Sequence, residues 1–257
     1  KDIDAIIFVI GSTELNANSF NDSVNSTINT FAVFLDRHKI DIPNIPIIYI
    51  STFQVYGKSE GLVNEKTPTN PNNIYSLVHK QSEDLLKLYS ELNNLKYLII
   101  RPTNIYGSIK NVFPFQRETL VPNCFIKEAL QENKITIKAP KSIYKDFLNI
   151  KDLVSFIDFI LQGFLWEEDI NLINISSGQT LDILFLAEKV KDIIKVRFDK
   201  DIKLLKPNWK NKKEVELNED RLKVYSIYRD LFDWEPNMSN NIEDELLNLI
   251  LDFYRNI

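Results

Sequence analysis

Glycine is scarce in this chain. Six of the 257 residues are glycine, whereas the average usage of roughly 7% would give about 18. No two of the six stand close enough to form a phosphate-binding loop, and both glycine-rich nucleotide fingerprints, G-x-G-x-x-G and G-x-x-x-x-G-K-[ST], are absent. Taken alone, this shortage argues against a self-contained nucleotide-binding domain.

Residues that bind metals or form disulfides are also few. The one cysteine, Cys124, excludes an internal disulfide framework and favours a reducing compartment, so we expect a cytoplasmic protein. One cysteine and two histidines cannot build the usual zinc sites. We therefore expect no metal, although an all-carboxylate magnesium site stays open.

Long runs of basic or apolar residues are missing as well. The net charge is −5, so a nucleic-acid partner is not expected. No apolar stretch reaches the roughly 18 residues of a membrane span, and no signal peptide is present, so we expect no membrane partner. Hydrophobic content of 44% and charged content of 26% are those of a soluble globular protein.

Three apolar segments predict buried strands. The segments over residues 5–10, 45–50 and 97–101 are short and rich in isoleucine, and glycine, serine or proline follows each of them. Between them, a polar stretch to about residue 27 precedes a helix that ends near residue 38, and a long helix is expected over 75–92. Buried strands that alternate with helices predict an α/β fold with a parallel sheet.

The character of the sequence changes after residue 107. The elements expected there are a helix over 124–132, a strand over 135–138, a helix that residues 146–152 open and that runs to 161, a strand over 171–175, a helix over 181–194, a strand over 202–205 and a helix from about 241. The sequence shows no clean linker. We therefore expect two lobes that are woven together.

Polar residues follow the predicted strands, at the edge of a parallel sheet where ligands bind. These pairs are Ser12-Thr13, Ser51-Thr52 and Thr103-Asn104. Tyr75 begins the long helix, and His79 lies one turn further along the same face. The hydroxyl of Thr52, the phenol of Tyr75 and the imidazole of His79 are therefore expected to face the same strand ends.

These three groups suit proton and hydride chemistry at a hydroxyl-bearing carbon. A tyrosine acts as a general acid or base only if its pKa falls from ~10 towards neutrality, which a nearby cation promotes. The hydroxyl of Thr52 could hold a substrate oxygen and pass on a proton.

Six short motifs occur in the order found in one enzyme family. They are Ile50-Ser-Thr-Phe-Gln-Val-Tyr-Gly57, Tyr75-Ser-Leu-Val-His-Lys-Gln-Ser-Glu83, Arg101-Pro-Thr-Asn-Ile-Tyr-Gly107, Lys145-Asp-Phe-Leu-Asn-Ile-Lys-Asp152, Asn174-Ile-Ser-Ser-Gly178 and Phe232-Asp-Trp-Glu-Pro236. The chain resembles the extended short-chain dehydrogenase/reductases, more narrowly their nucleotide-sugar epimerase and dehydratase branch. The resemblance implies a Rossmann-like doubly wound parallel sheet, truncated at its N-terminal part, with a smaller α+β substrate lobe.

The division into domains that we expect follows from this resemblance. Residues 1–112 would form the remainder of the dinucleotide-binding domain, and residues 148–175 would return to it. Residues 113–147 and 176–257 would form the smaller substrate-binding lobe.

The resemblance also implies roles for individual residues. The expected catalytic residues are Thr52, Tyr75 and His79. Contacts to NAD or NADP are expected from Gly11, Ser12, Ser51, Tyr75, His79 and Pro102. Contacts to the nucleotide sugar are expected from Thr52, Asn104, Leu120, Val121 and Lys145, with Asn104 and Lys145 near its diphosphate. A homodimer is expected through the helices around 27–36 and 75–92.

Two departures from the family pattern stand out. His79 replaces the lysine that normally holds the nicotinamide ribose and lowers the tyrosine pKa, and neutral histidine is shorter and mostly uncharged at pH 7. Lys80 is rotated by ~100° from that face and does not replace it. The opening strand and glycine loop are also absent, because only 74 residues precede Tyr75. Residues 5–10 therefore resemble the family's fourth strand, and we expect the chain to begin after the glycine-rich segment.

Two functions remain open. The first is an NAD(P)-dependent nucleotide-sugar epimerase, dehydratase or reductase in which Tyr75 moves the proton. Phe53 and Gln54 stand where the dehydratases typically carry acidic residues, which favours epimerase or reductase chemistry. The second is a non-catalytic relative that binds a sugar nucleotide or serves as a partner subunit. A serine hydrolase is a weak third class, because the chain has no G-x-S-x-G motif.

Structural roles compete with the functional ones for several residues. Thr52 could only cap backbone groups, Asn104 could only pin a loop, and His79 could be a helix histidine with its hydrogen bonds satisfied. His38 is expected in solvent at a helix end, and Glu65 at the surface.

Overall fold

The computed structural model describes residues 3–11, 19–107, 120–139, 143–164, 170–207, 221–227 and 242–255. Two predictions, the cofactor contact of Ser12 and the motif over 232–236, lie outside the described residues.

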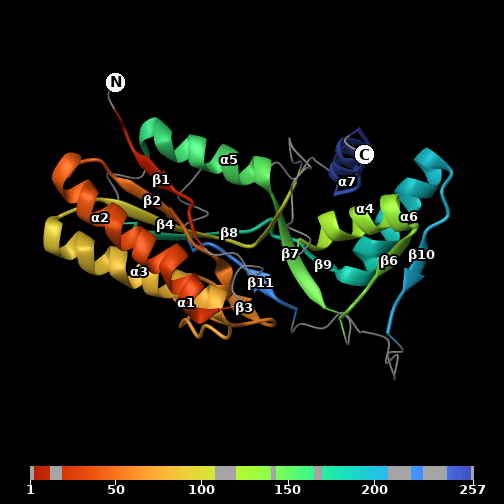
Figure 1. The fold of residues 1–257 in the computed structure, drawn as a ribbon, viewed down its shortest axis with the longest axis horizontal. Helices are drawn as coiled ribbons and strands as arrows, with labels where there is room; N and C mark the ends of the chain where they lie inside the picture. Colours follow the sequence, from red (N-terminus) through yellow and green to blue (C-terminus); the bar gives the residue numbers. More distant parts are fainter. Residues whose placement is uncertain are drawn as a thin grey trace.

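A four-stranded parallel sheet forms the centre of one lobe (Figure 1). Its order is β1 (Ile6–Phe8), β2 (Ile47–Ile50), β4 (Tyr97–Pro102) and β8 (Leu172–Ile175), and each neighbouring pair is parallel. Parallel strands place all their carboxyl ends at one edge, where ligands of such folds bind. The predicted α/β fold with a parallel sheet is confirmed.

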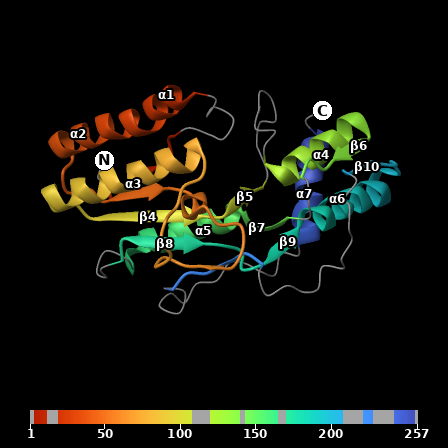
Figure 2. The ribbon, with the colours of Figure 1, turned by 90° about the horizontal axis from the view of Figure 1, so that it is seen from below.

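Helices cover both faces of this sheet (Figure 2). They are α2 (Thr30–Asp41) and α3 (Ile74–Asn93) on one face and α5 (Ile150–Phe159), continued by the π-helical η3 (Ile160–Phe164), on the other. Consecutive strand residues point to opposite faces, so Tyr49 packs against Phe31 of α2 while Ile48 packs against Phe156 of α5. Within the described residues, no helix is long and apolar enough to cross a bilayer.

The helical segment before β2 begins earlier than predicted. It comprises α1 (Phe20–Ser23) and the π-helical η1 (Val24–Asn29), which run into α2. Ser19 caps it, because its Oγ accepts a hydrogen bond of 3.3 Å from the Asp22 amide. The prediction of a non-helical polar stretch to residue 27 was wrong, since polar residues on an exposed face remain compatible with a capped helix.

A second lobe packs three helices around its own apolar core (Figure 1). The helices are α4 (Val121–Glu132), α6 (Ile183–Phe198) and α7 (Ile242–Arg255). A short parallel pair, β6 (Lys134–Thr136) with β10 (Lys203–Leu205), lies beside them. Buried residues of all three helices, including Phe125, Val190 and Leu249, form a single cluster.

A three-stranded sheet lies between the two cores. Strand β7 (Tyr144–Asn149) pairs in parallel with β5 (Asn104–Tyr106) and antiparallel with β9 (Thr180–Asp182). The prediction that residues 146–152 open a helix was wrong, because 146–149 belong to β7. Helix α5 begins at Ile150, after Asn149 accepts a 2.9 Å hydrogen bond from the Lys151 amide as the N-cap.

A smaller unit lies against the carboxyl edge of the large sheet. The 3₁₀ helix η2 (Phe53–Tyr56) packs on a parallel pair formed by β3 (Leu62–Val63) and β11 (Lys223–Val224). The segment between η2 and α3 therefore contains a short strand.

Gly57 ends η2 in a conformation that other residues avoid. Its φ is +63°, and a Cβ built there would lie 1.8 Å from the carbonyl oxygen of Asn70. We expect Gly57→Ala to lower the free energy of unfolding by about 3–5 kcal/mol, combining left-handed strain with a forced backbone shift. Urea denaturation measures this loss.

Gly61 is the matched control. Its φ is +78°, but a Cβ added there would have no other atom within 4 Å among the described residues. Gly61→Ala should therefore lower the free energy of unfolding only by the cost of the left-handed backbone conformation, about 1–2 kcal/mol. Equal losses for the two variants would contradict the predicted contact between position 57 and Asn70.

Candidate active site

Thr52 stands where β2 leaves the sheet and η2 begins. Its side chain is 6% exposed, and its Oγ1 accepts a hydrogen bond of 3.3 Å from the Gln54 amide as the N-cap of η2. The capping role is therefore present. A hydroxyl that accepts such a bond still carries its own O–H donor, so capping does not exclude a contact with a substrate oxygen.

The first turn of α3 is fixed beside η2. Asn73 and Ser76 form a capping box, in which Asn73 Oδ1 accepts a 2.8 Å bond from the Ser76 amide. Asn73 Nδ2 also donates to Gln54 Oε1 over 3.1 Å. This link between the two segments holds Thr52 and Tyr75 at the same edge of the sheet.

Tyr75 and His79 meet on one face of α3, as their spacing predicts. Their ring centroids are 4.6 Å apart in an edge-to-face arrangement. The end of β1 approaches the same face, because a Cβ on Gly11 would lie 3.3 Å from His79 Cε1 and 3.5 Å from Nε2. Glycine at this position therefore lets the strand end lie close to the imidazole.

The other side of the His79 ring faces the core. Nδ1 lies 2.9 Å from the phenol oxygen of Tyr49, a buried residue of β2, and His79 itself is 6% exposed. Burial raises the pKa of the Tyr49 phenol, so the phenol stays protonated at neutral pH. Nδ1 of His79 therefore has a hydrogen-bond partner in the core, as the structural interpretation of this residue predicts.

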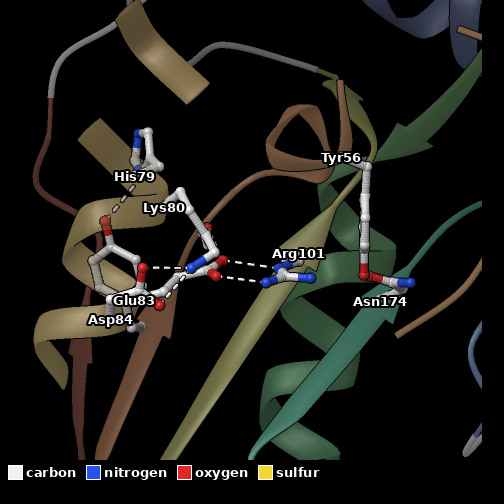
Figure 3. Close-up of polar contacts among 9 residues, drawn as sticks. Tyr56, His79, Lys80, Glu83, Asp84, Arg101 and Asn174 are labelled. Carbon is white, nitrogen blue, oxygen red and sulfur yellow. Dashed lines mark hydrogen bonds and ion pairs between the residues drawn. The ribbon is translucent and has the colours of Figure 1, made fainter. Parts of the chain in front are cut away.

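Two turns of α3 below Tyr75, Glu83 forms a buried ion pair with Arg101 of β4 (Figure 3). Arg101 Nε donates to Glu83 Oε1 over 2.8 Å and Nη2 donates to Oε2 over 2.5 Å, while the two side chains are 2% and 0% exposed. The hydroxyl of Ser51 adds a 2.6 Å bond to Oε1. Burial alone would lower the Arg101 pKa, but the bonds and charge of Glu83 raise it, so the guanidinium stays charged.

The polar contacts continue from Arg101 across the sheet. Its guanidinium carbon lies 4.7 Å from the ring centre of Tyr56, whose O–H donates to Asn174 Oδ1 over 2.9 Å (Figure 3). The backbone N–H of Asn174 donates to Glu65 Oε1 over 2.7 Å, and the backbone N–H of Ile227 donates to Glu65 Oε2 over 2.9 Å. Glu65, which was expected at the surface, is half-buried, and its carboxylate joins two distant backbone segments.

Asp146 anchors the contact between the lobes. This carboxylate of β7 is 1% exposed and accepts hydrogen bonds from Thr103 Oγ1 and from both the amide and the hydroxyl of Ser177. Burial raises the Asp146 pKa, although these hydrogen bonds act in the opposite direction. Asn104 Nδ2 donates to the Asp146 carbonyl over 2.8 Å, so the loop-pinning role of Asn104 is present.

The remaining predicted residues lie at different distances from this edge. The hydroxyl of Ser51 is directed to Glu83, and Pro102 is buried at the end of β4 opposite Ile175. Leu120 and Val121 form the start of α4, and Lys145 lies half-buried on β7 opposite Leu181. Gly11, Thr52, Tyr75 and His79 thus meet at one edge, while the other residues line neighbouring elements. The ligand contacts of all of them remain predictions.

His38 differs from its expected place in solvent. It is 2% exposed, and its Nε2 donates to the carbonyl of Ile45 over 2.7 Å. The expectation was wrong because the segment after α2 folds back over the last turn of the helix.

Some residues of this site were missed from the sequence. A charged residue at the end of an apolar strand, such as Arg101, must find a buried partner, and Glu83 follows His79 by one helical turn on the Tyr75 face. Those two signals together would have found the ion pair. No comparable signal marks Tyr49, whose partner depends on how α3 sits on β2.

Comparison with known proteins shows the family to which this chain belongs. A model of the NAD dependent epimerase/dehydratase family matches residues 1–175. The chain belongs to this family. It is similar to a dTDP-D-glucose 4,6-dehydratase of Dictyostelium discoideum, at 31% identity over 74% of this chain and 45% of that protein. It is also similar to a putative UDP-glucose 4-epimerase of Methanocaldococcus jannaschii, at 26% identity over 77% of this chain and 63% of that protein. The chain thus spans about half the length of such curated relatives.

Solved structures confirm the Rossmann-like fold. RMD from Pseudomonas aeruginosa complexed with NADPH has a TM-score of 0.78 at 21% identity, over 98% of this chain and 82% of that chain. The UDP-N-acetylglucosamine 4-epimerase from Methanobrevibacter ruminantium M1, in complex with UDP-N-acetylmuramic acid, also has a TM-score of 0.78, at 19% identity, over 100% of this chain and 78% of that chain.

The Glu83–Arg101 pair should dominate the stability of α3 on the sheet. Glu83→Gln leaves the Arg101 charge buried without its partner, and we expect a loss of about 3–5 kcal/mol in the free energy of unfolding. Guanidinium denaturation measures it.

Asp84→Asn is the matched control on the next residue. Asp84 pairs with Lys80 on the exposed side of α3, where its side chain is 56% exposed. An exposed i, i+4 pair contributes about 0.3–0.5 kcal/mol, so this variant should be nearly neutral. A Glu83→Gln loss as small as that of Asp84→Asn would show that the buried pair does not hold the helix.

Proposed function

We propose that this protein is an NAD(P)-dependent enzyme that epimerises or reduces a nucleotide sugar at a hydroxyl-bearing carbon. The observation that carries the proposal is the meeting of Tyr75, His79 and Gly11 at the carboxyl edge of the parallel sheet. Thr52 adds a hydroxyl that is linked to the same helix start through Gln54 and Asn73. Membership of the epimerase/dehydratase family supports this class of reaction.

The proposed roles follow from the chemistry of each group. Tyr75 takes or returns the proton of a sugar hydroxyl, and Thr52 orients that hydroxyl with its own O–H. The nicotinamide cofactor, when bound, accepts or returns a hydride. The nucleotide sugar is proposed to be bound by Asn104, Leu120, Val121 and Lys145, with Asn104 and Lys145 near its diphosphate. Lys145 keeps the positive charge but not the forked geometry of arginine.

The residues at the edge fit one end of the cofactor. Tyr75 and His79 supply polar groups that suit ribose hydroxyls, and glycine at position 11 lets the strand end lie close to the His79 ring. The fit does not extend to the pyrophosphate, since the 257 residues contain no glycine-rich phosphate loop.

The two residues after Thr52 favour epimerase or reductase chemistry over 4,6-dehydration. Phe53 is 8% exposed and packs in the core of the small β3–β11 unit. Gln54 binds Asn73 at the start of α3. Neither supplies a carboxyl group for the elimination of water, although one similar protein is named as a 4,6-dehydratase.

The alternative of a non-catalytic relative receives no support from the similar proteins, several of which are named as epimerases, dehydratases or decarboxylases. Cofactor binding with no turnover would nevertheless favour it.

Replacement of Tyr75 tests the proposed acid–base role. In the full-length protein, Tyr75→Phe should lower turnover of a nucleotide sugar by about 10²- to 10⁴-fold, because a positioned acid or base contributes that much. Cofactor affinity measured by calorimetry should change far less.

Tyr89→Phe supplies the control. Tyr89 lies further along α3, and its O–H donates to the carbonyl of Leu35. This variant loses a structural hydrogen bond and should keep its turnover. Equal turnover in Tyr75→Phe and the unaltered protein would rule out Tyr75 as the acid or base.

We also propose a homodimer through α2 and α3. These helices lie side by side on one face of the sheet (Figure 2). Their outer surfaces carry exposed apolar side chains, including Val33 at 64% and Leu88 at 54%. Exposed apolar groups on neighbouring helices are typical of a surface that a second copy covers.

Charged replacements test this interface. Val33→Asp combined with Leu88→Asp should convert a dimer to a monomer in light scattering, since unpaired charges would be buried. Val196→Asp, at an 80% exposed position of α6 in the other lobe, should leave the mass unchanged. A monomeric unaltered protein at tens of micromolar would contradict the proposal.

A further inference from the structure

The side chain of Asn149 joins helices of the two lobes. It ends β7 and caps α5, because its Oδ1 accepts a hydrogen bond of 2.9 Å from the backbone N–H of Lys151. Its Nδ2 donates over 2.7 Å to Oε2 of Glu245, a residue in the first turn of α7. Figure 1 shows α7 beside the start of α5. One amide group therefore connects the helix that covers the large sheet with a helix of the second lobe.

The partners of this amide allow one orientation. A carboxylate only accepts hydrogen bonds and a backbone N–H only donates them, so the amide oxygen faces Lys151 and the amide nitrogen faces Glu245. Asn149 is 6% exposed and Glu245 is 7% exposed. Lys151 Nζ adds a longer bond of 3.4 Å to Oε1 of Glu245 from a side chain that is 60% exposed. Loss of the Asn149 donor would thus leave Oε2 of a buried carboxyl group without this partner, which is unfavourable.

The chain passes between the lobes at the same place. Strand β7 lies between the two cores, and Ile150, which follows Asn149, begins α5. Gly107 follows β5 and packs against this point, since a Cβ added to it would collide with the side chain of Ile150. When two lobes move relative to each other, residues at the ends of elements absorb the change. Both of these passages are such ends.

Apolar packing alone does not fix α7 at this point. Leu246 and Leu249 of α7 lie in the core of the second lobe together with Phe147 of β7 and Phe125 of α4. These contacts are not directional. The hydrogen bond to Asn149 is directional, so it sets where α7, and with it the start of α4, lies relative to β7.

We propose that Asn149 and Glu245 are positioning residues that hold the second lobe at one angle to the first, the angle at which the protein binds its nucleotide sugar. This inference rests on the proposed function, in which the start of α4 and Lys145 of β7 bind that ligand. Breaking the bond lowers the fraction of molecules in the binding arrangement, and the apparent affinity falls with that fraction. Thr52 and Tyr75 lie in the first lobe, so turnover at saturating nucleotide sugar should change little.

Exchange of donor and acceptor isolates the bond. Asn149→Asp keeps an oxygen that caps α5, but it loses the donor and sets two carboxyl groups against each other. Glu245→Gln keeps an oxygen that accepts from Asn149. The double variant restores the bond in the opposite direction, because the introduced amide donates to the introduced carboxylate.

The angle between the lobes is measured first, without ligand. Val154→Cys on α5 and Val196→Cys on α6, both at exposed positions, carry spin labels in the full-length protein with Cys124→Ser. Electron–electron double resonance should give one narrow distance distribution for this protein and for its Glu245→Gln variant. Asn149→Asp should broaden or shift the distribution, and the double variant should restore it. An unchanged distribution in Asn149→Asp, or no recovery in the double variant, would overturn the proposal.

A second variant covers failure of Asn149→Asp to fold. Asn149→Ser also caps α5, but its side chain ends before the position of Nδ2 and adds no second carboxyl group. It should broaden the distribution in the same way, and an unchanged distribution would overturn the proposal.

Steady-state kinetics separate this inference from the proposed function. Asn149→Asp should raise KM for the nucleotide sugar about 10-fold, since a hydrogen bond to a charged group contributes at least that factor to an equilibrium. Its kcat and its affinity for NAD or NADP should change little, and the double variant should recover the original KM. A broadened distribution with unchanged KM would overturn the positioning role. If the unaltered protein converts no nucleotide sugar, the proposed function is refuted, and the distance distributions alone then uphold or overturn the link between the lobes.

Discussion

The buried pair of Glu83 and Arg101 is the interaction on which the rest of the site depends. Helix α3 packs on the sheet through apolar contacts, which are not directional and leave a helix able to slide or rotate. A bidentate carboxylate–guanidinium pair has one productive geometry. It therefore fixes both the height and the rotation of α3 against β4. Tyr75 and His79 lie on the same face of α3, two turns and one turn before Glu83, so their places follow from it.

The same pair also determines the position of β2. Ser51 donates to Glu83, and Thr52 follows directly in the chain. The carboxylate of Glu83 therefore positions both the hydroxyl of Thr52 and the phenol of Tyr75, although these two groups come from different elements. On the other side, the ring of Tyr56 and the amide of Asn174 extend the network to Glu65 and the β3–β11 unit. A second buried carboxylate, Asp146, joins the ends of β4 and β8 to the strand that leads into the other lobe.

The sequence predicts the sheet better than it predicts the contacts around it. Strands of a parallel sheet are buried on both faces and read as short apolar runs, so β1, β2, β4 and β8 were recognisable. Strand β7 was mistaken for a helix start because Asp146 reads as a helix-opening residue. Its carboxylate is satisfied by Thr103 and Ser177, which are distant in sequence. The meeting of Tyr75 and His79 follows from helix geometry alone. The hydrogen bond between His79 and Tyr49 depends instead on how α3 sits on β2, which no local pattern encodes.

We propose that this edge of the sheet performs chemistry on a nucleotide sugar. The most direct test incubates the full-length protein with NAD or NADP and a panel of UDP-, dTDP- and GDP-linked hexoses, and follows the sugars by proton NMR. We expect that at least one nucleotide sugar is converted at a single hydroxyl-bearing carbon, without loss of the nucleotide. Binding of both cofactor and sugar with no conversion of any member of the panel would contradict it.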